Sequence, residues 1–193
     1  MRKLRKKIKK VQDARRFEHT LGVEFTAAAL AMRNDASIAD ARTAGLLHDC
    51  AKCLSDQKRI AICEKYRIPM TEVEKRNPFL LHAKAGACLA REKYGVEDPD
   101  ILNAIRYHTT GRENMSLLEK IIFVADYIEP GRKQGSPEGL QKIRQLAFQD
   151  LDAALLKILD DTLRYLKSGN GEIDPATEAT WRYYREIAGQ TEP

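Results

Sequence analysis

Apolar residues recur at helical spacing along almost the whole chain. Leu4, Ile8 and Val11 follow the i, i+4, i+7 spacing of an amphipathic helix, and residues 23–31 continue this pattern in a second helix. Continuous alternation of apolar and polar residues, which is typical of strands, is scarce. The pattern therefore predicts an all-α protein.

Short polar residues, prolines and glycines mark the ends of the expected helices. Ser37, Ser55 and Ser116 suit N-cap positions, and several prolines suit the first turn of a helix. After the first two helices, the expected helices cover residues 37–51, 55–66, 78–93, 99–108, 116–128, 138–167 with a break near 149, and 175–188. Loop signals lie at residues 129–137 and 168–171. We expect about eight to ten helices in one domain over residues 1–193.

The positive charge of the chain is concentrated at its start. The formal net charge is +5, but residues 1–10 hold seven Lys or Arg and no acid, which leaves 26 basic and 28 acidic residues and a net charge of −2 for the remainder. The chain also lacks the basic and aromatic alternation of RNA-binding segments. We therefore expect no nucleic-acid partner, and we expect residues 1–10 to dock as a helix with their cations in solvent.

The sequence also lacks the signals of a membrane or secreted protein. No apolar run approaches the roughly 20 residues of a membrane-spanning helix, and no apolar stretch follows the N-terminal charges as in a secretory signal. The four cysteines lack the second ligand pair of a zinc ribbon and are expected to behave as small apolar residues. These observations predict a cytoplasmic protein without a membrane partner.

Histidines and buried acids carry the candidate chemistry. The four histidines stand at or near the ends of expected helices: His19, His48, His82 and His108. Asp49 follows His48 after an apolar run, and Asp126 lies within the apolar segment 121–128. Burying a carboxylate there is costly without a partner. A divalent first-row metal ion can be that partner, because both histidine and aspartate bind such ions. Singly, each is more often a hydrogen-bonded core residue, but together they indicate a metal site.

The order of these residues resembles the H…HD…D motif of the HD-domain phosphohydrolases. His19 stands about 30 residues before the His48-Asp49 pair, and Asp126 stands about 77 residues after it. The match covers about residues 15–132, with additional C-terminal helices over about 138–189. The resemblance implies an all-α, single-domain HD-type helical bundle.

Finer features narrow this resemblance to the bacterial symmetrical bis(5'-nucleosyl)-tetraphosphatases. These features are Lys52, three residues after Asp49, and the segments 107–111 and 125–132. The narrower resemblance implies hydrolysis of diadenosine tetraphosphate to two ADP. It also implies one or two divalent metal ions, with iron as the expected metal and manganese or another first-row metal as the alternative.

The resemblance implies roles for residues at the matching positions. The implied metal ligands are His19, His48, Asp49, Asp126, His82 and His108, with the last two supporting a second ion that Asp49 bridges. The implied substrate contacts are His19, Lys52, His82, His108, Thr109, Asp126, Arg132, Gly171, Ile173 and Asp174. His82 and His108 therefore have two alternative roles, as ligands of a second metal or as hydrogen-bond donors to phosphate. The family often has a histidine where this chain has Asp174.

The implied mechanism is attack of a metal-activated water on a phosphoanhydride. Asp49 and Lys52 are the implied catalytic residues, and Lys52 and Arg132 suit non-bridging phosphoryl oxygens because both are cationic. Two other functions stay open at this point. One is another HD-domain activity, such as a 5'-nucleotidase or a guanosine tetraphosphate hydrolase, and the other is a nucleic-acid-binding module with a structural metal. The oligomeric state is also open, with a homodimer among the alternatives.

Overall fold

Every regular element of the protein is a helix within the part that the structure describes. The structure is a computed structural model that describes residues 1–133, 136–169 and 171–190. Its helices are α1 (Arg2–Lys9), α2 (Ala14–Arg33), α3 (Ile38–Leu47), α4 (Asp56–Lys65), α5 (Glu72–Arg76), the 3-10 helix η1 (Pro78–Leu81), α6 (His82–Tyr94), α7 (Pro99–Arg106), α8 (Leu117–Ile128), α9 (Pro137–Ala147), α10 (Leu151–Ser168) and α11 (Pro175–Gln190). The predicted all-α class is confirmed.

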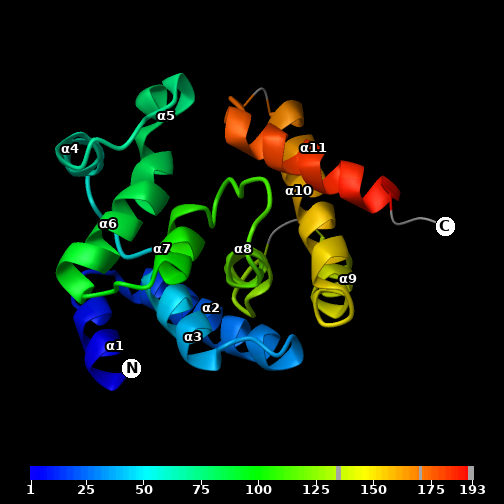
Figure 1. Cartoon of the computed structure of the whole chain (residues 1–193), viewed down its shortest axis with the longest axis horizontal. Coiled ribbons are helices and arrows are strands. Elements are labelled where there is room, and N and C mark those ends of the chain that lie inside the picture. The colour runs from blue at the N-terminus through cyan, green and yellow to red at the C-terminus, as the bar shows by residue number, and fades with distance from the viewer. Residues whose placement is uncertain (134–135, 170, 191–193) are drawn as a thin grey trace.

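Helix α8 lies at the centre of the bundle, between α2, α3 and α7 on one side and α9 and α10 on the other (Figure 1). Ile121, Ile122 and Val124 of α8 are fully buried, and the main apolar core around them extends from Ile8 to Tyr184. Each fully buried aliphatic side chain of this size contributes about 1.5–3 kcal/mol. The central helix is therefore held rigidly from several directions, and it carries Asp126 with it.

The predicted helix caps are confirmed. The side chains of Ser37, Ser55 and Ser116 each accept a hydrogen bond from the backbone N–H three residues later. At Ser116 the Glu119 carboxylate also accepts the Ser116 N–H, which completes a capping box. Gly95 ends α6 in the left-handed conformation, with φ of 73°, as expected for a glycine after a helix.

Several predicted helix boundaries are wrong. Helix α3 ends at Leu47 instead of residue 51, because the chain turns at His48, whereas α7 ends at Arg106, close to the predicted end near His108. The segment expected as one helix over 78–93 begins with the 3-10 helix η1. The short helix α5 was not predicted, so the described residues contain more helices than the expected eight to ten.

The basic first helix docks on the bundle, as predicted. Ile8 is fully buried, whereas Val11 is 37% exposed and lies past the end of α1, so its expected place in the apolar stripe is wrong. Glu24 of α2 is fully buried, and its carboxylate accepts hydrogen bonds from Arg5 of α1 and Arg42 of α3. A buried carboxylate with two guanidinium partners thus joins the first three helices.

No helix in the described ranges combines the length and apolarity that crossing a membrane requires. Three of the cysteines are buried as expected, and burial raises the pKa of Cys50 to about 12. The expectation is wrong for Cys53, which is exposed at the surface. Gln134 and Gly135 of one expected loop, and Asn170 of the expected turn, lie outside the described residues.

Candidate metal centre

Six of the predicted site residues converge at the centre of the bundle, and we call them the metal-site cluster. Its members are His19 of α2, His48 and Asp49 of the turn after α3, His82 at the start of α6, His108 after α7, and Asp126 of α8. Two overlapping groups within it, His19–His48–Asp126 and His48–Asp49–His108, each place one ligand atom per residue within 4.8 Å of the others.

Three histidines of the cluster are oriented by the same local device. The imidazole Nδ1–H of each donates to the carbonyl oxygen of the residue three positions earlier, at 2.7 Å: His48 to Gly45, His82 to Phe79 and His108 to Ile105. A carbonyl oxygen only accepts, so Nδ1 carries the proton and Nε2 presents its lone pair to the cluster. Burial also lowers the pKa of His82 to about 4, which keeps this imidazole neutral at pH 7.

His19 is oriented by a carboxylate instead. Its Nδ1–H donates to Oε1 of Glu129 at 3.0 Å, and Oε2 of Glu129 accepts the Gly131 N–H at 2.6 Å. Glu129 is 3% exposed and packs against Gly22 of α2, where an added Cβ would lie 2.4 Å from Oε2. The sequence reasoning missed Glu129, although its position one helical turn after Asp126 was a usable signal.

One half of the cluster surrounds the Nε2 atoms of His19 and His48, which are 3.3 Å apart. Oδ1 of Asp126 lies 3.0 Å from the first Nε2 and 3.7 Å from the second. Oδ2 of Asp49 lies 3.8 Å and 3.5 Å from the same two atoms. Ligands bound at about 2.0–2.1 Å to one metal lie roughly 3.0–3.4 Å from their neighbours, so only a small adjustment separates these atoms from a shared ion.

The other half surrounds Oδ1 of Asp49. This oxygen lies 3.2 Å from Nε2 of His82 and 3.7 Å from Nε2 of His108, and these two nitrogens are 3.2 Å apart. It is buried and accepts no hydrogen bond from any described residue, which is costly for a carboxylate oxygen without a cation. The two oxygens of Asp49 therefore face the two halves. The donor set of neutral imidazoles and carboxylates fits divalent first-row metals.

Both carboxylates of the cluster are ionised, and each also contacts an arginine. Burial raises the pKa of Asp49, but the surrounding imidazoles outweigh this effect and hold it well below its usual range. Burial likewise raises the pKa of Asp126, but His19 and the charge of Arg132 lower it well below its usual range. Arg132 donates to Asp126, and Arg16 donates to Oδ2 of Asp49 at 2.7 Å. The sequence reasoning missed Arg16, which lies one helical turn before His19.

The structure also brings Lys52 to the cluster. Its Nζ lies 3.1 Å from Nε2 of His82, and the side chain is half-buried, which lowers the pKa of the ammonium group. Thr109 follows His108 and lines a small cavity of about 160 Å³ together with Leu80, Tyr107 and Asp174. Lys52 and Arg132 thus lie within the metal-site region, and Thr109 lies at its margin.

Residues 171–174, which form the turn before α11, make hydrogen bonds that fix the start of α11. Gly171 donates its backbone N–H to the Leu166 carbonyl at 3.0 Å. The carboxylate of Asp174 accepts the Ala176 N–H at 2.9 Å and the Thr71 hydroxyl at 2.9 Å, and Ile173 beside it is half-buried. The structure therefore does not bring Gly171, Ile173 and Asp174 into the metal-site cluster.

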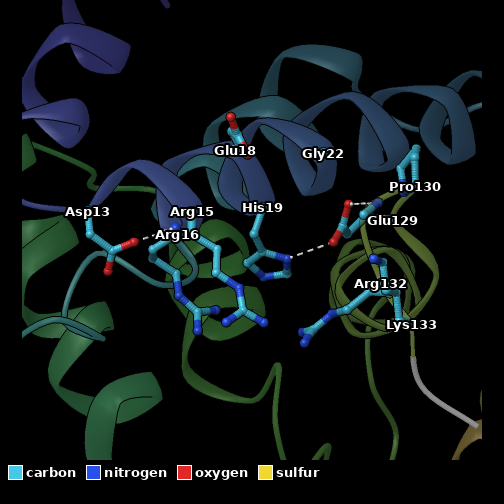
Figure 2. Close-up of a pocket in the computed structure, with 11 residues that line it drawn as sticks. Asp13, Arg15, Arg16, Glu18, His19, Gly22, Glu129, Pro130, Arg132 and Lys133 are labelled. Carbon is cyan, nitrogen blue, oxygen red and sulfur yellow. Dashed lines mark hydrogen bonds and ion pairs between the residues drawn. The ribbon is translucent and has the colours of Figure 1, made fainter.

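A larger cleft opens beside His19, on the outer side of the cluster. It has a volume of about 930 Å³ and is lined by residues of α2 and of the segment after α8. We call it the basic cleft, after the four cations in its lining: Arg15, Arg16, Arg132 and Lys133. Figure 2 shows the guanidinium groups of Arg15, Arg16 and Arg132 extending into the same space below His19.

The chain was compared with known proteins. The HD-domain family matches residues 16–131, a range that contains the whole metal-site cluster. A protein of Halalkalibacterium halodurans named symmetrical bis(5'-nucleosyl)-tetraphosphatase is 43% identical over 86% of this chain and 87% of its own length. A protein of Bacillus subtilis with the same name is 40% identical over 91% of this chain and 92% of its own length.

The fold has a close match as well. A crystal structure from Clostridium acetobutylicum, described as a predicted HD superfamily hydrolase involved in NAD metabolism, superposes with a TM-score of 0.91 and is 41% identical, covering 96% of both chains. The sequence matches and the fold agree with the histidine and aspartate cluster found in the core. This chain therefore belongs to the HD-domain family and, within it, to the group of the symmetrical bis(5'-nucleosyl)-tetraphosphatases.

Proposed function

We propose that this protein is a metal-dependent hydrolase that cleaves diadenosine tetraphosphate symmetrically into two ADP. The observation that carries the proposal is the position of Asp49, whose two carboxylate oxygens face the two halves of a buried imidazole cluster. The names of relatives that match most of the chain support the substrate. The basic cleft beside the cluster supports a polyanionic substrate, because its four cations can pair with phosphates.

The cluster would hold one or two ions, with His19, His48, Asp49 and Asp126 in one half. When bound, such an ion supplies Lewis acidity toward a phosphoryl oxygen and lowers the pKa of water toward neutrality. The protein residues position the anhydride. Lys52 donates hydrogen bonds to a non-bridging oxygen from beside His82, and the planar guanidinium of Arg132 can donate two parallel ones.

Several finer features belong to the same proposal. We propose two ions, because Asp49 faces both halves of the cluster, and His82 and His108 then act as ligands of the second ion. Iron is the metal that the family resemblance implies. One core from Ile8 to Tyr184 supports a single domain. The cytoplasmic location, the homodimer and the substrate contacts at Thr109 and residues 171–174 stay predictions.

Metal analysis combined with a nucleotide panel tests the function. The purified protein should contain a first-row metal and release two ADP from diadenosine tetraphosphate. Asp49→Asn, a nearly isosteric change, should abolish turnover and lower the metal content, while the helical circular dichroism stays unchanged. Release of phosphate from nucleoside monophosphates, or of pyrophosphate from guanosine tetraphosphate, without ADP formation would assign another HD-domain activity. Full turnover by Asp49→Asn after complete metal removal would refute the metal mechanism.

A further inference from the structure

We propose that the basic cleft binds the two phosphates of the departing ADP half, and that Arg15 and Lys133 make the enzyme select a tetraphosphate over shorter bridges. This inference rests on the proposed function. It concerns two residues outside the metal-site cluster, which no sequence motif marks.

The reaction defines two sides of the substrate. Water adds to the second phosphorus from one nucleoside, and the bond from that phosphorus to the oxygen that bridges to the third phosphorus breaks. The electron pair stays on that oxygen, the water oxygen becomes a terminal oxygen of the attacked phosphate, both water protons pass to solvent, and both products are ADP. Each side of the breaking bond therefore carries two anionic phosphates, and each side needs its own place in the protein.

The two cavities near the cluster differ in their capacity. The cavity that Thr109 lines has about 160 Å³, which is small for a nucleotide, whereas the basic cleft has about 930 Å³. Sites for small organic ligands commonly span about 300–1,000 Å³. The basic cleft is therefore the place beside His19 with enough space for a whole nucleotide half.

The charges of the cleft are available to a ligand. Arg15 and Lys133 are exposed, and neither forms an ion pair with any described residue. Two of the three acids in the lining already accept hydrogen bonds: Asp13 caps α2 through the Arg16 N–H, and Glu129 accepts from His19. The side chain of Glu18, the third acid, points to the opposite side of α2 from the guanidinium groups in Figure 2. The four cations of the lining therefore outnumber its acids.

The inner wall of the cleft continues into the cluster. Nη1 of Arg16 donates to the carboxylate of Asp49. Arg132 donates from Nη2 to the carboxylate of Asp126 and from Nε to the Asp126 backbone oxygen at 2.8 Å. A guanidinium has five N–H donors, so both arginines keep donors for a second partner. The cations therefore form a path from the metal ligands outward. Arg16 and Arg132 lie nearest the breaking bond, and Arg15 and Lys133 lie at the exposed end.

The test compares two substrates that differ only in the length of the bridge. The double variant Arg15→Gln/Lys133→Gln is assayed on diadenosine tetraphosphate and on diadenosine triphosphate, whose departing half has one phosphate fewer. We expect kcat/KM for the tetraphosphate to fall about ten-fold or more, and the preference for the tetraphosphate to fall by a similar factor. We also expect a shallower dependence of kcat/KM on ionic strength, since exposed charges act through screened attraction.

A matched control removes the same charges elsewhere. Arg2→Gln/Lys58→Gln changes two exposed cations that lie outside the cleft and form no ion pair with any described residue, and it should keep the wild-type preference. An equal loss on both substrates, or no loss on either, would overturn the inference while the proposed function stood.

Binding of inorganic tripolyphosphate, measured by calorimetry, separates this inference from the proposed function. The Arg15→Gln/Lys133→Gln variant should bind it more weakly than the wild type, whatever the turnover. Unchanged affinity would overturn the inference even if the enzyme proved to hydrolyse a different nucleotide.

Discussion

Replacement of Glu129 tests whether metal binding depends on a residue outside the six proposed ligands. The buried carboxylate serves two donors, His19 Nδ1–H and the Gly131 N–H. In Glu129→Gln the amide keeps one acceptor oxygen and places a donor NH₂ at the other position, so only one of the two hydrogen bonds survives. In Glu129→Ala both are lost, and the imidazole of His19 is free to rotate or to change its tautomer.

The expected magnitude follows from these contacts. A hydrogen bond to a charged group contributes about 1.5–3 kcal/mol, and about 1.4 kcal/mol corresponds to a ten-fold change in an equilibrium constant. Glu129→Ala should therefore weaken metal binding about ten- to hundred-fold, which agrees with the usual effect of removing a residue that orients a metal ligand. Glu129→Gln should lie between this variant and the wild type.

The assay is competition for the metal with a chromogenic chelator, measured together with kcat/KM at saturating metal. Glu119→Gln is the matched control because Glu119, in the first turn of α8, is also a buried carboxylate but is hydrogen-bonded to Arg112 and the Ser116 N–H instead of a metal ligand. The control should lose stability without losing metal affinity. Wild-type metal affinity in Glu129→Ala would refute the reasoning that the carboxylate positions His19.

Three further predictions concern catalysis and stability. Lys52→Met should lower kcat at least 100-fold with unchanged metal content, because it removes a cation from the reacting phosphate. Steady-state kinetics and elemental analysis measure the two quantities, and a nearly unchanged kcat would show that Lys52 has only a structural role. Glu24→Gln should lower the free energy of unfolding by about 1–3 kcal/mol, because the contacts with Arg5 and Arg42 lose their charge; an unchanged urea midpoint would contradict this. Leu155→Ala should cost about 2–5 kcal/mol in the same urea assay, since the side chain is fully buried, and a smaller loss would mean that the core relaxes around the cavity.

The helix starts could be predicted from the sequence because a cap is a local feature. A serine at the right position accepts the N–H of the first turn wherever the helix lies, as Ser37 and Ser116 do. The short helix α5 was missed because Val73 is its only apolar residue, although its Thr71–Glu74 capping box is a local signal of the same kind. Glu74 is also buried and pairs with Lys84 of α6, and that contact exists only after folding.

The positions of the candidate ligands could be predicted because histidines and an aspartate stand within apolar segments at an informative spacing. The residues that contact and orient these ligands could not be predicted. The contact of Arg16 with Asp49 depends on how α2 crosses the turn after α3, and the burial of Glu129 depends on the missing side chain at Gly22. In the sequence alone both residues resemble ordinary surface charges, because their partners lie in distant segments of the chain.

The hydrogen bonds of His48, His82 and His108 have a consequence for how the protein can change over generations. Their carbonyl partners belong to the last turns of α3, η1 and α7, where several backbone oxygens lack a partner within the helix, and the Phe79 oxygen also accepts the backbone N–H of His82. Each imidazole thus also helps to end a helix. A descendant that lost its activity would no longer need Asp126 for metal binding but would still be penalised in stability for replacing these three histidines. Persistence of the three histidines in an inactive homologue would therefore be a sign of inherited architecture and not of retained chemistry.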